Sequence, residues 1–271
     1  MKSITSLIVS LIFTSCTAMK LSIPDTFKKQ ATNWRVQGAR KNKMVVGEYS
    51  TSRIKRGLHI LSSGENGFFL ENLLLSPAGV QKQEHVSTDK ARFRYTISDQ
   101  KNTADISGQE KELSRSIGYH AMNSNSILNG LTQTQQHEYI FSAEIKTRGA
   151  DSTGNWQLVM NNAYDRQIDS VKSLFKYVPS DDNGTATNGK DTIFIKSVSV
   201  RNMEGANGKQ GRFPIKMLSG YELSTADGVM AIIDLIDKSV WMYNELEQKD
   251  RFITTIITTA LFARKVNDTK W

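Results

Sequence analysis

The sequence RFITTIITTALFAR, from Arg251 to Arg264, decides the fold, because it carries no charge between its two arginines. Residues 253–259 are all β-branched and therefore favour a strand by propensity. The apolar residues nevertheless recur at helical spacing, at Ile253, Ile256, Ile257, Ala260 and Leu261. The opposite side is mostly threonine, whose hydroxyls can bond to carbonyls one turn back. The pattern predicts a helix over about residues 245–264 that is buried on most sides.

The predicted helix has a start signal and a length that excludes one role. Asn244 can serve as the N-cap, with Glu247 three residues later as in a capping box. A bilayer requires about 20 consecutive apolar residues, which this segment lacks. We therefore expect a core helix and not a membrane span.

The composition is that of one globular domain. The chain has 271 residues, 38% of them hydrophobic, with four prolines and one cysteine. A single cysteine leaves no disulfide framework and no paired-cysteine metal site. We therefore predict a single β-rich domain over residues 31–271, and no repeat architecture, metal or cofactor.

Short segments with strand character precede the helix. Residues Arg92 to Ile97 alternate cleanly, with Phe93 and Tyr95 on one face and polar residues on the other. We expect strands at residues 34–38, 44–49, 54–61, 80–86, 92–97, 139–147, 156–161, 192–200 and 213–223. Two hairpins are expected, one pairing 139–147 with 156–161 and one pairing 229–236 with 240–243. Half-buried antiparallel strands are the natural interpretation.

Other segments give weaker signals. Residues 64–67 have the composition of a turn, and residues 68–75 fit either a buried strand or a helical turn. Residues 98–136 are rich in Ser, Asn and Gln, with a short helix expected at 108–117. Residues 171–178 are apolar and aromatic. Loops are expected at 179–190 and 204–211.

An antiparallel β barrel or strongly curled sheet packed around the C-terminal helix accommodates these elements, because closure removes exposed strand edges. A terminal β hairpin that leads into an uncharged helix, over residues 228–265, resembles the end of the tubby-like group, which includes scramblase-like proteins. In that group a C-terminal helix threads a β barrel. The resemblance rests on this pattern and implies fold more than function.

The N-terminus has the layout of an export signal. Met1 and Lys2 form a short positive region, residues 4–13 are apolar, and a small residue precedes Cys16. Residues Phe13-Thr14-Ser15-Cys16 resemble the lipobox of bacterial lipoproteins, which prefers Leu where Phe13 stands. The resemblance implies a signal peptide over residues 1–15, lipid such as palmitate on the sulfur and the amine of Cys16 as a firm anchor, and a lipidated tether over residues 16–30.

An alternative cleavage after Ala18 would discard the cysteine and release the protein from the membrane. With lipidation, the resemblance implies a bacterial cell-envelope protein held at the membrane. No acidic residue follows Cys16 closely, so a periplasm-facing position is expected.

Positive charge is concentrated after the expected tether. The chain has a formal net charge of +8, and residues 28–56 contain nine basic residues against one acid, Glu48. Basic side chains attract anionic headgroups by about 1 kcal/mol each near a membrane surface. The candidate contact residues are Arg40, Lys41, Lys43, Arg53, Lys55 and Arg56. Strand alternation would send only some of them to one face, which leaves an ordinary solvated face as the alternative.

No motif for catalysis is present. The acidic loop from Asp181 to Asp191 fails the calcium-binding spacing, because its twelfth position is Thr192. The four histidines show no ligand spacing, and serine-elbow and phosphate-loop motifs are absent. Trp34, Trp156 and Trp241 lie in or beside expected strands and are expected in the core or barrel wall, with a carbohydrate or lipid platform as the sharper alternative.

Three functions remain open. The first is a non-enzymatic envelope lipoprotein that binds or scaffolds a partner at the membrane face, through anionic headgroups or an envelope polymer. The second is a barrel that carries a small apolar ligand, which requires space beside the helix. The third is an envelope hydrolase without a recognisable motif. Nucleic-acid binding is not expected of an exported protein.

Overall fold

The computed structural model describes residues 21, 23–39, 41–67, 70–121, 131–149, 153–167, 182–204 and 210–264. The helices are α1 (Asp25–Lys28), α2 (Glu71–Leu75), the 3-10 helix η1 (Ser76–Ala78) and α3 (Gln248–Ala263). The strands are β1 (Ala31–Gln37), β2 (Val45–Val46), β3 (Tyr49–Thr51), β4 (Lys55–Arg56), β5 (Ile60–Asn66), β6 (Val80–Ser98), β7 (Asn102–Ala121), β8 (Leu131–Gly149), β9 (Asn155–Asp165), β10 (Asn183–Thr187), β11 (Thr192–Glu204), β12 (Gln210–Thr225), β13 (Gly228–Asp234) and β14 (Ser239–Tyr243).

The strands form a closed antiparallel barrel, as the sequence predicts. Following the hydrogen bonds, the order is β3-β2-β1-β14-β13-β12-β11-β10-β9-β8-β7-β6, and β3 then pairs with β6. Twelve strands of the described chain therefore make a closed ring. Short β4 and β5 add to the free stretch of β6 beyond this closure.

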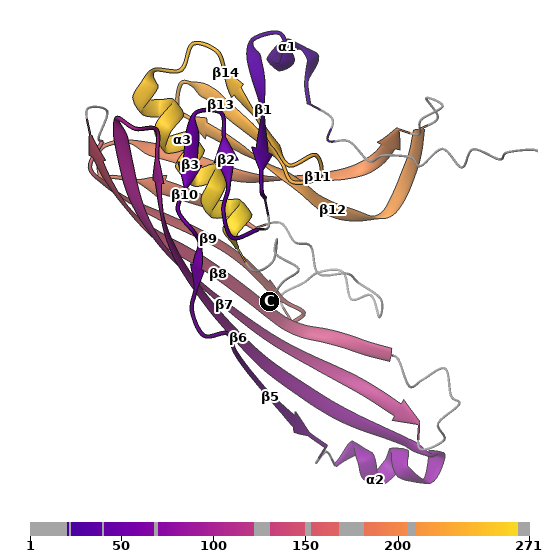
Figure 1. The fold of residues 1–271 in the computed structure, drawn as a ribbon. Coiled ribbons are helices and arrows are strands. Elements are labelled where there is room, and N and C mark those ends of the chain that lie inside the picture. Colours follow the sequence, from indigo (N-terminus) through magenta and orange to yellow (C-terminus); the bar gives the residue numbers. More distant parts are fainter. Residues whose placement is uncertain are drawn as a thin grey trace, which may run out of the picture.

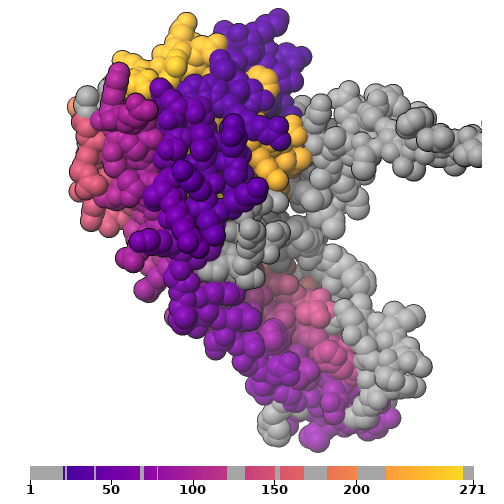
Figure 2. Space-filling view, in the orientation of Figure 1, coloured from indigo at the N-terminus to yellow at the C-terminus, as the bar shows by residue number. Residues whose placement is uncertain are grey.

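Three strands are much longer than the ring requires. Strands β6, β7 and β8 have 19, 20 and 19 residues, and their far ends leave the ring together. We call this extension the arm and define it as residues 80–90, 111–121 and 131–139 together with β5, α2 and η1. Figure 1 shows the arm running away from α3, and Figure 2 shows it projecting from the body of the barrel.

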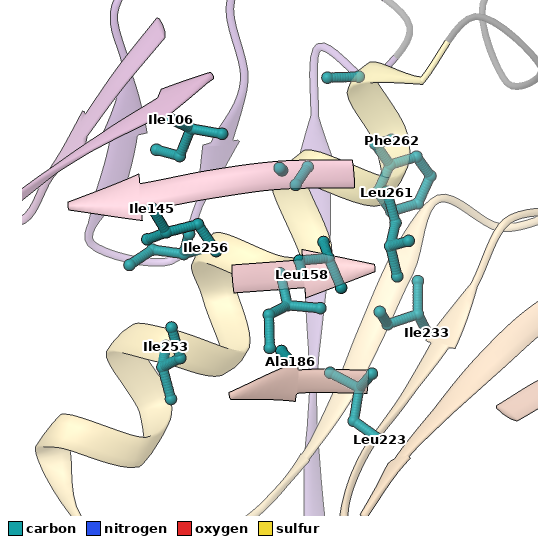
Figure 3. Packing of buried hydrophobic residues seen from close by; sticks show 14 of the residues in the cluster. Ile106, Ile145, Leu158, Ala186, Leu223, Ile233, Ile253, Ile256, Leu261 and Phe262 are labelled. Carbon is teal, nitrogen blue, oxygen red and sulfur yellow. The ribbon is translucent and has the colours of Figure 1, made fainter. Parts of the chain in front are cut away.

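Helix α3 fills the ring. Every residue from Phe252 to Ala263 is buried. Figure 3 shows Ile253, Ile256, Leu261 and Phe262 pointing among side chains of the surrounding strands, such as Leu158 and Leu223. Burying an aliphatic side chain stabilises a fold by about 1.5–3 kcal/mol. The predicted core helix is thus confirmed, and the barrel closes around it.

Three of the four threonines on the polar side of α3 have partners for their hydroxyls, whereas the buried Thr254 hydroxyl has none among the described residues. The hydroxyls of Thr255, Thr258 and Thr259 donate to the carbonyls of Arg251, Thr254 and Ile256 at 2.8, 2.8 and 3.0 Å. Thr259 also lies 2.8 Å from the hydroxyl of Tyr95 on β6. Because these three hydroxyls have partners, most of the polar side of the helix can be enclosed without water.

The predicted N-cap is wrong. Glu247 precedes the first helical residue and makes no side-chain cap hydrogen bond. The Oδ1 atom of Asn244 instead accepts a hydrogen bond from the Thr32 hydroxyl at 2.7 Å. The side chain of Arg251 donates to the carbonyls of Asn244 and Leu246. A long-range contact with β1 has therefore replaced the local cap.

The arginine at the other end of the segment is buried. Arg264 is 1% exposed and donates to a carboxylate oxygen of Asp182 at 2.5 Å. It also donates to the hydroxyls of Tyr139 and Tyr221, both at 2.9 Å. Tyr139 in turn donates to Glu110 at 2.6 Å. Burial raises the pKa of both tyrosines above the usual range, so they stay protonated and act as donors.

Several local predictions fail because strand pairing overrides local signals. Residues 108–117 are not a helix but the middle of β7, which pairs on both sides with β6 and β8. The expected loop 179–190 contains β10, and the expected turn 64–67 lies mostly in β5. Residues 54–61 divide between β4 and β5. Residues 171–178 lie outside the described residues.

Other predictions are confirmed. Both expected hairpins form, as β8 with β9 and as β13 with β14. Trp156 is buried in the core. Trp34 is half-buried against the same core, and Trp241 is half-buried against a small cluster on the outer wall. Leu21 and Ile23 pack with Ile232 in a small outer cluster, so the end of the expected tether already contacts the barrel.

Candidate anion-binding surface

The sequence-predicted basic residues divide between the two faces of the sheet. Arg53 and Lys55 are exposed on the outside of the barrel. Arg56 pairs with the inward-facing Phe93, and its side chain donates to Asn42 Oδ1 at 3.0 Å. The alternation of strand side chains therefore removes Arg56 from the candidate surface.

The remaining predicted residues lie elsewhere. Lys41 and Lys43 are exposed in the connection between β1 and β2. Arg40 lies outside the described residues, as do the expected signal peptide and Cys16. Of the six predicted residues, Arg53 and Lys55 line the same hollow on the barrel wall.

Arg53 and Lys55 lie near two cations from other strands, Arg94 and Lys146. Lys55 of β4 lies directly opposite Arg94 of β6 in the ladder. With Lys146 of β8, these side chains line an open hollow of about 370 Å³ on the outer wall. Like charges directly opposite each other in a sheet destabilise it. An anion between them would remove that repulsion.

The two carboxylates of the same hollow are already engaged. Asp105 accepts from Arg148 at 2.6 Å and from the hydroxyl of Thr96 at 2.9 Å. Glu144 pairs with Lys146 at 3.0 Å. The positive charge of Arg53, Lys55 and Arg94 is therefore not compensated by these acids.

The positive charge continues along the outer face. Lys90 of β6 lies directly opposite Lys111 of β7, and Arg92 lies between Lys90 and Arg94 on the same face. A second hollow of about 290 Å³ is lined by Lys90, Arg92 and Lys111. We call the exposed residues Arg53, Lys55, Lys90, Arg92, Arg94 and Lys111 the basic track. Within the described part of the chain, none of these six forms an ion pair.

Four members of the basic track were not predicted from the sequence, although the sequence carries a signal for them. They are Lys90, Arg92, Arg94 and Lys111. The alternation from Arg92 to Ile97 predicts a polar outer face, and Lys90 continues it at the same spacing. Arg94 lies opposite Lys55, and Lys90 lies opposite Lys111, only because of the way the strands pair. That pairing is set by the closed ring and cannot be inferred from one strand.

Three of the four histidines gather on the inner face of the arm, each beside a carboxylate. His59 Nε2 lies 2.7 Å from Asp89 Oδ1, and the pairs His85–Glu65 and His137–Glu112 are each 3.8 Å apart. Cross-strand register explains the grouping, since scattered sequence positions become neighbours. Among the described residues, no group of three or more His, Cys, Asp or Glu residues could hold a metal ion.

An open cavity lies beside the first turn of α3. It measures about 670 Å³ and has apolar walls from Trp156, Ile193 and Met230. Acidic residues surround it, including Asp227 and Asp250. Burial raises the pKa of the Asp250 carboxyl above its usual value. This cavity is large enough for a small ligand.

None of the helices in the described ranges combines the length and apolar character needed to cross a bilayer. No protein-family model matches this sequence, and comparisons with curated proteins and with solved structures likewise found no match.

Proposed function

We propose that this protein is a lipid-anchored protein of the bacterial cell envelope that binds anionic headgroups through the basic track and has no catalytic role. The observation that carries the proposal is the pair of like-charge contacts, Lys55 with Arg94 and Lys90 with Lys111, on one exposed face. Each contact costs roughly 0.2–1 kcal/mol when no anion is present. A fold that keeps both is suited to an anionic partner.

The anchor and the basic track would act together. The acyl chains on Cys16 would supply a firm anchor, and a basic surface would add an attraction to anionic headgroups. Each cation near an anionic surface adds about 1 kcal/mol. The lipobox-like residues ending at Cys16 support the first attachment, and labelled fatty acid should be incorporated into the native protein but not into Cys16→Ala.

Vesicle co-sedimentation tests the basic track separately from the anchor. The expected mature chain, from residue 16 onward and with Cys16→Ser, is mixed with vesicles of phosphatidylcholine and phosphatidylglycerol. We expect binding that weakens with salt, and Lys55→Gln/Arg94→Gln should lower the affinity about tenfold or more.

The matched control removes the same charge elsewhere. Lys190 and Lys196 are exposed and lie outside the basic track, so Lys190→Gln/Lys196→Gln should stay within about twofold of the parent. Equal losses in the two double variants would show that net charge alone acts and would overturn the proposal. Binding of the parent to a soluble polyanion but not to vesicles would also overturn it in favour of an envelope polymer.

A second candidate function, carriage of a small apolar ligand, is favoured by the cavity beside the first turn of α3. Helix α3 fills the ring itself, so a carried ligand would occupy this open cavity of about 670 Å³. Native mass spectrometry of the purified protein should then show a bound small molecule that is lost in Met230→Trp. A spectrum with protein mass alone in both samples would remove this candidate.

A further inference from the structure

Helix α2 is attached to the arm by its polar side. The Asn72 side chain donates to the Lys82 carbonyl at 3.0 Å and accepts from the Lys82 amide at 2.7 Å, which continues the pairing of the β6 edge. It also donates to the Gly67 carbonyl at 2.7 Å. Glu71 pairs with the Lys82 ammonium at 3.0 Å. The polar residues of this short helix are therefore used to hold it in place.

The apolar side of the same helix faces outward. Leu70, Leu73 and Leu74 are 76, 74 and 82% exposed. They stand at i, i+3 and i+4, the spacing of one helical stripe. A surface helix normally buries this stripe and exposes its polar side, so α2 is attached the opposite way round. Figure 1 shows it at the end of the arm that lies farthest from α3.

The size of this leucine patch limits what can cover it. Three leucines offer roughly 300 Å² of apolar area by the usual conversion from transfer free energy. A stable protein interface needs about 800 Å² from each partner. A bilayer needs no such minimum and no complementary shape, because its acyl layer accepts any apolar projection.

The arm as a whole is slightly acidic, with four Lys and Arg against six Asp and Glu, and its cations of the basic track stand where it leaves the ring. Lys90 and Lys111 of the basic track lie on the arm or at its start, on the outer face. Eight residues of β6, or roughly 26 Å, separate Lys90 from Lys82, which holds α2, so the leucine patch and the basic track are separate contacts.

We propose that the arm is a membrane-contacting finger whose tip inserts Leu70, Leu73 and Leu74 into the acyl layer of a bilayer. The inference rests on the proposed function only in naming a membrane as the partner. It adds a second contact of different chemistry, which should persist when electrostatic attraction is screened.

A site-specific probe tests insertion. Cys16 is the only cysteine, so an environment-sensitive fluorophore on Leu74→Cys in the expected mature chain, from residue 16 onward and with Cys16→Ser, reports one position. With the mixed vesicles, we expect a blue shift and quenching by a lipid that carries its quencher in the acyl chain. The same probe at Lys55→Cys should respond only to a headgroup quencher.

The two probes separate the two proposals. A response at Lys55→Cys without one at Leu74→Cys would overturn the finger and leave the headgroup proposal standing. The reverse result would support the finger and overturn the headgroup proposal. A blue shift at Leu74→Cys that depends on protein concentration and needs no vesicles would identify a protein contact and overturn the finger.

An unlabelled pair of variants excludes an effect of the fluorophore. In about 1 M salt, where the Debye length is about 3 Å, Leu73→Glu should lower vesicle binding about tenfold. Leu61→Glu is the matched control, since Leu61 is 63% exposed on β5 but lies outside α2. Equal binding by Leu73→Glu and Leu61→Glu would overturn the finger, and unchanged melting temperatures would show that both variants fold.

Discussion

The ring and the arm share strands β6, β7 and β8, but the inward-facing side chains of β6 are apolar in the ring and polar in the arm. In the ring part of β6, the inward residues Phe93, Tyr95 and Ile97 are buried against α3. In the arm part of β6, the inward positions hold His85, Ser87 and Asp89, and the most exposed leucines of the arm lie on α2 at its tip. One strand thus changes from an apolar to a polar inner face along its length.

Length explains the change. Helix α3 has 16 residues and spans about 24 Å, whereas the 19 residues of β6 span about 63 Å. The strands therefore extend well beyond the helix that can fill them. Where no helix lies behind the sheet, apolar inward residues would have nothing to pack against. The length of α3 therefore determines how much of the sheet becomes a barrel.

The largest expected effect comes from placing a charge in each region. Ile257→Asp should abolish folding, because Ile257 is 0% exposed and an unpaired carboxylate would enter the core. Leu73→Asp in the arm should change the melting temperature by no more than about 2 °C. Circular dichroism melts measure both. If Ile257→Asp melts like the parent, α3 does not organise the ring.

The next effect contrasts a buried ion pair with an exposed one. Arg264→Leu leaves Asp182 charged and buried, and should cost about 3–5 kcal/mol of unfolding free energy. Arg148→Leu breaks the ion pair with Asp105 on the outer face and should cost no more than about 1 kcal/mol, since the two side chains are 65 and 43% exposed. Urea titrations give both values. Similar costs would mean that the Arg264 cluster is not important for closing the ring.

A smaller effect separates stability from binding on the outer face. Lys55→Glu converts the Lys55–Arg94 contact from like to opposite charges and should stabilise the fold by roughly 0.2–1 kcal/mol. Salt should reduce the gain. The same variant should bind anionic vesicles more weakly than the parent. If Lys55→Glu raises both stability and vesicle binding, or lowers both, then the Lys55–Arg94 pair does not serve an anionic partner.

The smallest effect concerns pH. Asp234, at the turn between β13 and β14, is 3% exposed, and its Oδ1 accepts from the amides of Ile236 and Asp237. Burial raises the pKa of this carboxyl above its usual value. Its favourable contribution is therefore fully present at low pH and is lost as pH rises through the folded-state pKa.

Asp234→Asn keeps an acceptor and removes the charge. We expect it to be more stable than the parent at neutral pH, with a difference that shrinks toward acidic pH. Urea titrations at several pH values measure this difference. A difference that grows as the pH falls would contradict the sign of the shift.

The basic track shows how far sequence reasoning reaches at the candidate site. Arg53 and Lys55 were identified from a local excess of charge. Arg56 belongs to the same excess but faces inward, because it neighbours Lys55 on a strand. Lys90 and Lys111 are separated in sequence and become opposite partners only through the pairing of β6 with β7. Charge content is local, whereas charge proximity in a sheet is not.

The periodicity of residues 251–264 and the turn residues before them are local properties. They were enough to predict a buried helix, observed as Gln248–Ala263, with antiparallel strands around it. The tertiary structure alone decided that Arg264 is buried against Asp182, that residues 108–117 are strand, and that three strands outrun the helix to form an arm. These outcomes depend on partners far away in the chain, whose pairing free energy exceeds the local preferences. The orientation of α2 belongs to the same class, because Asn72 finds its partner on β6.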